Sequence, residues 1–477
     1  MKLTKHTEHT KHTKQDVQKL LLKYIGLLIL TAVQVSCFAF LWYSHYVPLL
    51  RELRLGFFFW GNIAVIGLYL FVLIFFNKSV DAYKSSYMIA RHTCIAFGLA
   101  TVFTNMITVL QTWMIGRYYF NVVPMMIMTA VQVLVIVIWS LAMKGLYLRL
   151  RKVAKVVVIH GTCPPNTFKA FLEKSYLTDE KLYTLTVCDF EKDEVGAYQA
   201  ILSNDQVILY DLPSDKRNAI LKFCYENAKD IFITPKISDI LMIGAEKVDT
   251  SDTPLLKVRK RGLPLESLFV KRVTDIILSS IGLIIVSPFL LISALVIKLY
   301  DGGSVFYRQE RLTRDGKQFD IIKFRSMREN SEKDGPQIAK QNDKRITPYG
   351  KFLRATHLDE LPQLINILKG DMTFVGPRPE RVENIEKYEK IIPEFRYRLV
   401  VKAGLTGYAQ IYGKYDTTPL DKIKLDLEYI EKHSLWLDIK LIILTFKIIF
   451  HRENAEGVTK EQDSALLDED FDKKNND

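Results

Sequence analysis

The stretch Thr274–Leu299 reads TDIILSSIGLIIVSPFLLISALVIKL and decides how the chain is organised. As one straight helix it would be about 39 Å long, enough to cross a bilayer. Ser287 and Pro288 stand at its middle, where a proline removes a backbone hydrogen bond and kinks a helix. Both flanks are basic. The pattern therefore predicts a membrane helix over about 274–299, broken at Ser287–Pro288, that re-enters on the face it came from. A full crossing is the alternative.

Four longer apolar runs precede this stretch, at about 20–43, 55–76, 88–113 and 121–143. Each has the roughly 20 residues that a spanning helix needs. Lysines and arginines gather in the tail before the first run and in the segment after the fourth. The positive-inside rule then places both ends of the predicted four-helix transmembrane bundle, residues 1–150, in the cytoplasm. Buried core helices of a soluble protein are the weaker alternative, because four such runs in succession are rare.

The composition agrees with a membrane location. The chain has 477 residues, enough for two or three domains, and a formal net charge of +12. Its basic residues stand beside apolar runs, which favours an anionic membrane over nucleic acid as partner. The five cysteines show no CxxC or Cys/His spacing, so neither a disulfide framework nor a zinc site is predicted.

Residues 151–256 alternate short apolar runs with helical patterns. Expected strands cover 153–161, 183–189, 206–212 and 230–235, with helices such as 166–176 and 214–228 between them. This alternation predicts a small, Rossmann-like parallel α/β domain. Its first strand ends at Gly161, but GTCPPN follows, without the later glycines that let a backbone approach a pyrophosphate. A nucleotide site, with Asp189 as the ribose-binding acid, is therefore the lesser alternative to a role in self-association.

Residues 257–458 form a basic, mixed α/β domain that includes the re-entrant helix, and 459–477 form a polar tail. Within this domain, 435–452 (LWLDIKLIILTFKIIFHR) is too short to cross and carries spaced lysines. It is typical of an interfacial helix lying on the bilayer.

The candidate reactive centre lies in 353–380, LRATHLDELPQLINILKGDMTFVGPRPE. Asp359 and Glu360 are adjacent, and Pro362 stands where a first helical turn would begin. At a helix N-terminus the dipole lowers the pKa of carboxylates and attracts phosphate oxygens. An ordinary capping role for the two acids is the alternative.

Basic residues around the two acids favour phosphate chemistry. Five of them are candidate phosphate ligands: Lys323, Arg325, Arg354, Arg378 and Arg381. The prolines on either side of Arg378 stiffen its turn and could present it as a bidentate clamp. Acids for a divalent ion amid guanidinium groups are what transfer at phosphorus requires.

Three segments carry a family resemblance: FYRQERLTRDGKQFDIIKFRSM, LDELPQLINILKGDMTFVGPRPE and AGLTGYAQIYGK. Together, over roughly 266–455, they resemble the bacterial sugar transferase family, the monotopic polyprenyl-phosphate sugar phosphotransferases. The four N-terminal helices and the α/β segment are similar to the larger members, which start capsule, exopolysaccharide or O-antigen repeat units at the cytoplasmic face of the bacterial inner membrane.

The resemblance implies a mechanism. Asp359 attacks the sugar-linked phosphate of a UDP-sugar, releases UMP and carries the phosphosugar until undecaprenyl phosphate displaces it. The resemblance also implies Mg²⁺ near the dyad, with Glu360 and also Asp359 as ligands. Ser287 and Pro288 match the family's helix break. A homodimer is implied as well. Glucose or galactose is the expected sugar. The alternatives are a glycosyltransferase that moves sugar without phosphate, and a non-enzymatic membrane scaffold.

Overall fold

The computed structural model describes residues 2–84, 90–150, 153–161, 165–175, 183–249, 252–258, 262–328, 345–413 and 417–449. The chain divides into two compact units, Met1–Lys152 and Val153–Asp477.

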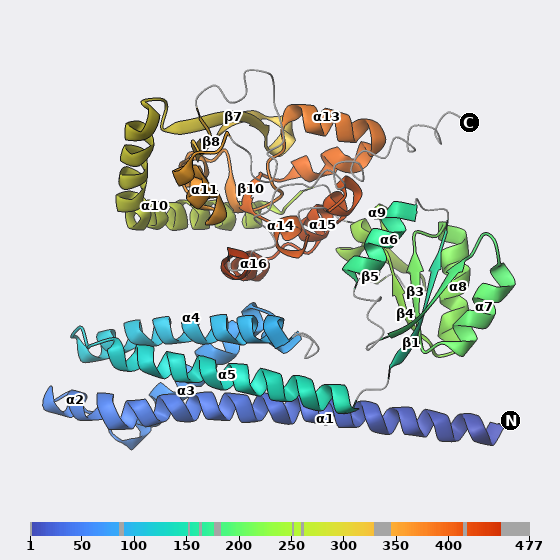
Figure 1. The fold of residues 1–477 in the computed structure, drawn as a ribbon, viewed down its shortest axis with the longest axis horizontal. Coiled ribbons are helices and arrows are strands. Elements are labelled where there is room, and N and C mark those ends of the chain that lie inside the picture. Colours follow the sequence, from blue (N-terminus) through green and yellow to red (C-terminus); the bar gives the residue numbers. More distant parts are fainter. Residues whose placement is uncertain are drawn as a thin grey trace. The chain divides into compact units, whose positions relative to one another are not determined.

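The first unit is made of helices (Figure 1). Its elements are α1 (Lys2–Leu41), a π-helical turn η1 (Trp42–Tyr46), α2 (Val47–Glu52), α3 (Phe59–Ser79), the 3₁₀ turn η2 (Ala82–Lys84), α4 (Ala90–Gly116) and α5 (Val123–Leu150). Four segments of this unit are long and apolar enough to span a membrane: Val17–Glu52, Phe59–Ser79, Ala90–Gly116 and Val123–Leu150; a fifth such segment, Leu265–Tyr300, belongs to the second unit. The four segments of the first unit are the four predicted runs, and they fit a multi-pass membrane protein.

Polar side chains occupy the interior of this unit. Gln132 Nε2 of α5 donates to Tyr69 Oη of α3 at 2.9 Å and to the Gln34 carbonyl of α1 at 3.0 Å. Asn105 Nδ2 of α4 donates to Gln132 Oε1 at 2.8 Å. The network joins all four long helices, and in lipid such bonds hold helices together because apolar surface gives little drive for association.

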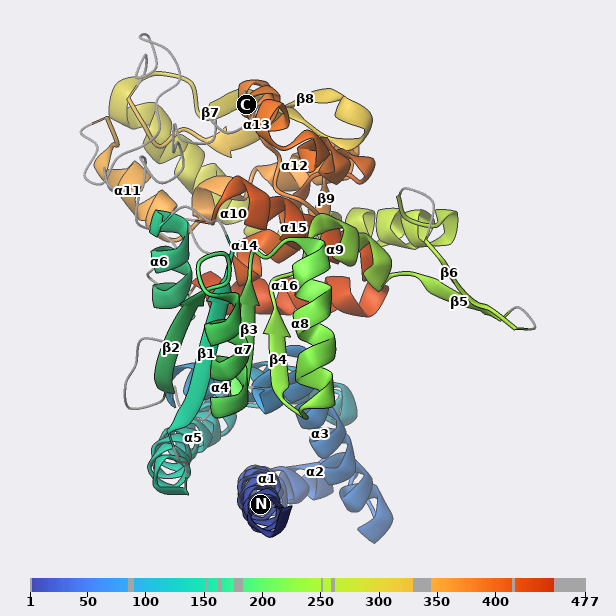
Figure 2. The ribbon, with the colours of Figure 1, turned by 90° about the vertical axis from the view of Figure 1, so that its right-hand side faces the viewer.

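The second unit begins with a parallel sheet, as predicted. Strands β1 (Ala154–His160), β2 (Tyr183–Asp189), β3 (Gln206–Tyr210) and β4 (Asp230–Ile233) pair in the order β2-β1-β3-β4. Helices α6 (Pro165–Lys174), α7 (Glu194–Ser203) and α8 (Ser214–Glu226) connect them (Figure 2). Central strand β1 is buried from Val156 to Ile159, which explains its continuous apolar run. Asp189 ends β2 in an ion pair with Lys192, at 2.8 Å.

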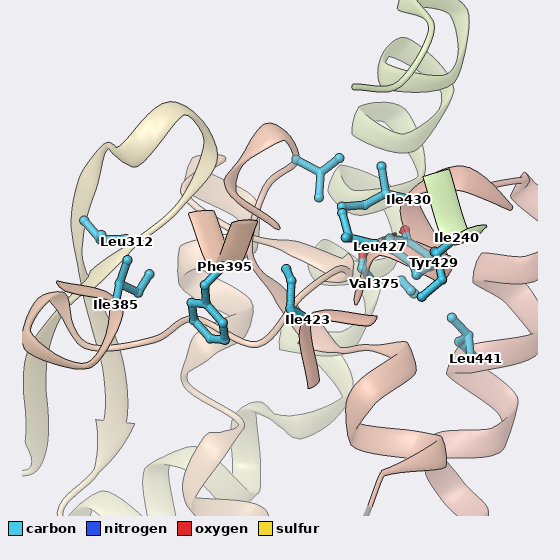
Figure 3. Close-up of a cluster of buried hydrophobic side chains, with 11 residues drawn as sticks. Ile240, Leu312, Val375, Ile385, Phe395, Ile423, Leu427, Tyr429, Ile430 and Leu441 are labelled. Atoms are coloured by element: carbon cyan, nitrogen blue, oxygen red, sulfur yellow. Dashed lines mark hydrogen bonds between the residues drawn. The ribbon is translucent and has the colours of Figure 1, made fainter. Parts of the chain in front are cut away.

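Helix α9 (Ile237–Ile243) links the sheet to the C-terminal part of the unit. Its Ile240 lies in one hydrophobic cluster with Ile423, Leu427 and Ile430 of α15 (Pro419–Glu431) (Figure 3). The chain then forms the antiparallel hairpin of β5 (Glu246–Asp249) and β6 (Pro254–Lys257) (Figure 2).

Helix α10 (Leu265–Asp301) is the predicted re-entrant segment. It is bent into two arms (Figure 1), and Pro288 lies inside it. The expected break is not an interruption of the helix. Pro288 has no N–H to donate to the Ile284 carbonyl one turn earlier, and the Ser287 hydroxyl donates to that carbonyl instead, at 2.8 Å. Ser287 and Pro288 therefore lie within one continuous helix that is bent into two arms.

Both arms of α10 pack on the same C-terminal domain. Before the proline, Asp275 Oδ1 accepts hydrogen bonds from the Thr373 hydroxyl and the Phe374 N–H, each at 3.0 Å. After it, the Ser293 hydroxyl lies 2.8 Å from the Tyr349 hydroxyl.

The domain itself starts with the hairpin of β7 (Phe306–Leu312) and β8 (Gln318–Phe324), which turns at η3 (Arg314–Gly316). It continues with α11 (Pro348–Ala355), η4 (Leu358–Glu360), α12 (Gln363–Lys369), β9 (Thr373–Val375), α13 (Val382–Ile391), η5 (Pro393–Val400), β10 (Gly404–Thr406), α14 (Tyr408–Tyr412), α15 and α16 (Leu435–Ile449). Strands β9 and β10 are parallel. Helix α16 covers most of the predicted interfacial segment and buries Leu441 and Leu444, whereas Leu435 and Trp436 are exposed.

Candidate active site

Asp359 and Glu360 lie on the 3₁₀ turn η4, between α11 and α12. Helix α12 begins at Gln363, with Pro362 as its N-cap residue. The two acids therefore occupy a separate turn directly before the helix. The sequence predicted that the two acids lie at a helix N-terminus, and they lie just before that of α12, with Pro362 as the N-cap residue instead of a residue of the first turn.

Asn366 fixes α12 against the β-hairpin. Its side chain is 1% exposed, accepts from the Ile322 N–H at 3.0 Å and donates to the Asp320 carbonyl at 2.8 Å. Both bonds go to the backbone of β8 beside Lys323. The amide thus sets the register between the strand that carries Lys323 and the helix that follows the dyad.

Glu360 is the meeting point of two cations. Its Oε1 accepts from Lys323 Nζ at 2.6 Å and from Arg378 Nη2 at 2.9 Å. Lys323 comes from β8 and Arg378 from the turn after β9. Of the predicted phosphate ligands, these two are brought directly to the dyad.

The electrostatics of the two acids differ. Burial raises the pKa of Glu360, but the charges of Arg378 and Lys323 outweigh burial and lower the pKa far below its ordinary value. Burial also raises the pKa of Asp359, and the adjacent Glu360 carboxylate raises it further. The charges of Lys323 and Arg354 only partly oppose these effects. The prediction that a helix dipole lowers both pKa values is therefore wrong for Asp359, because burial and the neighbouring negative charge dominate.

The other predicted phosphate ligands surround this pair. Arg354 lies in the last turn of α11, where its charge acts on Asp359. Arg325 directly follows β8 and is buried, and Arg381 is the residue before α13. Within the described ranges, the side-chain hydrogen bonds of the dyad go to Lys323 and Arg378 and not to Arg325 or Arg381.

The turn that carries Arg378 is set by two glycines. A Cβ on Gly404 would collide with the Gly376 backbone, and a Cβ on Gly376 would collide with the Lys402 carbonyl. The close approach is between Gly376, which directly follows β9, and Gly404, the first residue of β10. The glycines of Gly376–Pro377 and Ala403–Gly404 in the sequence motifs are therefore needed for backbone packing, whatever their part in the chemistry.

The donor chemistry of the two acids bears on whether they can hold Mg²⁺. Among the described residues, no group of three or more His, Cys, Asp or Glu side chains is gathered. Mg²⁺ is usually held by one or two carboxylates together with substrate phosphates. Asp359 and Glu360 could supply the two carboxylates of such a site. Glu360 Oε1 also accepts hydrogen bonds from Lys323 and Arg378.

Sequence reasoning missed Asn366 and two arginines that hold the turn carrying Arg378: Arg398 Nη2 donates to the Arg378 carbonyl at 3.0 Å and Arg311 Nη1 donates to the Pro379 carbonyl at 3.3 Å. Asn366 sits in an amphipathic helical pattern, and the two arginines sit in strongly charged runs. No local signal separates such residues from surface residues, because their partners are distant in the sequence.

The part of the chain that carries the dyad is similar to known proteins. Residues 266–452 match the family described as bacterial sugar transferase. A UDP-glucose:undecaprenyl-phosphate glucose-1-phosphate transferase of Escherichia coli K12 is 43% identical over 43% of this chain and 43% of its own length. A UDP-N-acetylgalactosamine-undecaprenyl-phosphate N-acetylgalactosaminephosphotransferase of Aeromonas hydrophila is 41% identical over 38% and 44%.

A further relative, a UDP-glucose:undecaprenyl-phosphate glucose-1-phosphate transferase of Caulobacter vibrioides, is 38% identical over 43% of this chain and 79% of its own length. The chain spans about half the length of the other curated relatives. The match with the Caulobacter protein covers most of that relative, and the residues that match the family, 266–452, include Asp359 and Glu360. The chain belongs to the bacterial sugar transferase family.

Proposed function

We propose that the protein transfers a sugar 1-phosphate from a UDP-sugar to undecaprenyl phosphate and releases UMP. The observation that carries this proposal is the convergence of Lys323 and Arg378 on the Asp359–Glu360 dyad. Such a cluster offers a nucleophile beside cations that neutralise a diphosphate. The substrates named for the relatives support the same reaction.

The transfer proceeds in two displacements at one phosphorus. A carboxylate oxygen of Asp359 forms a bond to the sugar-linked phosphorus, while the bond from that phosphorus to the oxygen of UMP breaks and UMP leaves with the electron pair. An oxygen of undecaprenyl phosphate then attacks the same phosphorus, and the bond to Asp359 breaks. Two anionic substrates from different phases thus never have to react directly with each other.

The raised pKa of Asp359 suits a nucleophile, because a more basic carboxylate attacks more readily. Glu360 stays ionised through its two cations. Lys323, Arg354 and Arg378 supply positive charge for the phosphates. Mg²⁺ would be held by Glu360 and Asp359 and would neutralise charge that develops on the diphosphate.

The site works at the cytoplasmic face of the bacterial inner membrane in this proposal, with α10 as a re-entrant helix. Support comes from its two arms, which pack on one domain. In a straight spanning helix the two ends would lie on opposite sides of the bilayer. The α/β domain binds no dinucleotide and contributes to a homodimer. The pathway is the first membrane step of capsule, exopolysaccharide or O-antigen synthesis.

Glucose or galactose is the proposed sugar. Two of the relatives above are named for glucose and one for N-acetylgalactosamine. Incubating the purified protein and Mg²⁺ with a panel of UDP-sugars and undecaprenyl phosphate, and measuring the nucleotide released, tests sugar and reaction together. UMP supports the proposal. UDP would indicate a glycosyltransferase that moves sugar alone, and no nucleotide with any donor would favour a membrane scaffold.

A further inference from the structure

The backbone of the turn Pro377–Glu380 is held by hydrogen bonds to its carbonyl groups. Each of its four carbonyls accepts a hydrogen bond: Pro377 from the Gly404 N–H at 2.9 Å, Arg378 from Arg398 Nη2 at 3.0 Å, Pro379 from Arg311 Nη1 at 3.3 Å and Glu380 from the Leu312 N–H at 3.2 Å. Two donors are backbone groups of neighbouring strands. The other two are arginine side chains, and Arg398 holds the residue that contacts Glu360.

Arg398 belongs to η5 and is 2% exposed. Its Nη2 also lies 2.8 Å from Asp426 Oδ2 of α15, and its Nη1 lies 3.5 Å from Glu380 Oε1. Its guanidinium packs over the Phe395 ring at 5.0 Å from the centroid. Lys422, one turn before Asp426, forms an ion pair with Glu380 as well. The Arg398 guanidinium thus contacts the backbone of the turn, the Glu380 carboxylate at the end of the turn and the buried Asp426 of α15.

This geometry indicates that the Arg398 guanidinium holds the orientation of the turn in addition to filling a buried space. The proline rings restrict the turn but leave the orientation of the Arg378 peptide to its partners. Arg398 anchors that peptide to α15 through Asp426, and the Arg378 side chain reaches Glu360 from it. A lysine could keep one of these contacts, but it lacks the flat fork needed to make all three at once.

We propose that Arg398 is a positioning residue, which acts on the proposed phosphosugar transfer by orienting Arg378 toward Glu360. The inference rests on that proposed function. Arg398 itself touches neither member of the dyad; its contacts are with the turn, Glu380, Asp426 and Phe395. Its effect must therefore pass through the Arg378 backbone.

A double-mutant cycle on the full-length protein tests this, with UMP release from UDP-glucose measured for wild type, Arg398→Lys, Arg378→Ala and the double variant. We expect Arg398→Lys to lower kcat/KM roughly ten- to a hundredfold, the range that follows from a small misplacement of a positioning group. In the Arg378→Ala background the same change should cost less than about twofold, because coupled residues are non-additive. Equal losses in both backgrounds would overturn the proposal, since a purely structural arginine harms both alike.

Arg217→Lys is the matched control. Arg217 of α8, like Arg398, is paired with an acid, Asp239 of α9, but it is only partly buried and lies in the α/β domain. It should change thermal stability in detergent and leave kcat/KM unaltered. If Arg398→Lys does not fold, Asp426→Asn replaces it, because this variant keeps Arg398 and loosens its anchor, with the same non-additivity expected. A wild-type protein that releases UMP from no UDP-sugar would refute the proposed function, whereas an active wild type with additive losses refutes the positioning role alone.

Discussion

Replacing Lys323 with methionine tests the electrostatics of the dyad. The change keeps the apolar stem and removes the charge 2.6 Å from Glu360 Oε1. Both side chains are mostly buried, at 19% and 14% exposed, so solvent screens the pair little. Glu360 keeps Arg378 as a partner at 2.9 Å, and the loss is therefore that of one charged hydrogen bond, about 1.5–3 kcal/mol. At 1.36 kcal/mol for each factor of ten, kcat/KM should fall roughly ten- to a hundredfold.

The pH dependence of the same variant separates two roles of Lys323. Removing the positive charge raises the pKa of Asp359, the nucleophile of the proposed reaction, because Lys323 is one of the charges that oppose the effect of burial on this acid. The acid limb of the profile of kcat/KM should then move to higher pH, and part of the lost activity should return as pH rises. A raised KM without a shifted limb would instead mean that Lys323 acts only on the substrate phosphate.

Lys317→Met is the matched control, since Lys317 lies on the same β-hairpin but is exposed. It should leave both kcat/KM and the acid limb unchanged. Lys323→Met activity within twofold of wild type, with an unmoved limb, would refute the electrostatic reasoning.

Three further predictions concern metal dependence, stability and topology. Glu360→Gln should lower the rate of UMP release and weaken its dependence on Mg²⁺, measured by metal titration. Burial raises the pKa of Glu380, but the charges of Lys422 and Arg398 outweigh burial and lower the pKa. The contribution of Glu380 to the free energy of unfolding is therefore present above about pH 4.3 and is lost as pH falls. Glu380→Gln should lower the melting temperature at pH 7 more than at pH 4. In a cysteine-free background of intact cells, an impermeant thiol reagent should label a cysteine at Tyr119 and spare one at Lys390; labelling of Lys390 would mean that α10 crosses the membrane.

Much of the fold could be read from local patterns. The apolar runs predicted four spanning helices because membrane burial requires length and hydropathy alone. The strands of the α/β domain were also predictable, because a strand buried on both faces, such as β1, gives a continuous apolar run in the sequence. Pro288 explains a bend in α10, but the hydrogen bond from the Ser287 hydroxyl to the Ile284 carbonyl is a local contact that the sequence pattern does not determine.

The candidate site was predictable where it depends on motifs. Lys323 and Arg378 were expected near Asp359 and Glu360, and both reach Glu360. The parts that were missed depend on contacts between distant segments. Arg398 meets Asp426 and the Arg378 carbonyl only once η5 and α15 have packed together, and Asn366 finds its partners on β8. The pKa of Asp359 was predicted in the wrong direction because its burial is a property of the folded domain.

The most direct test of the covalent mechanism uses only the first substrate. Wild-type protein is mixed with UDP-glucose and Mg²⁺ without undecaprenyl phosphate, quenched, and digested with trypsin, and the mass of the peptide 355–369, which contains Asp359, is measured. The mechanism predicts one equivalent of UMP and a peptide heavier by one sugar phosphate, both absent in Asp359→Asn. Release of UMP only when undecaprenyl phosphate is also present, with the peptide unmodified, would contradict it.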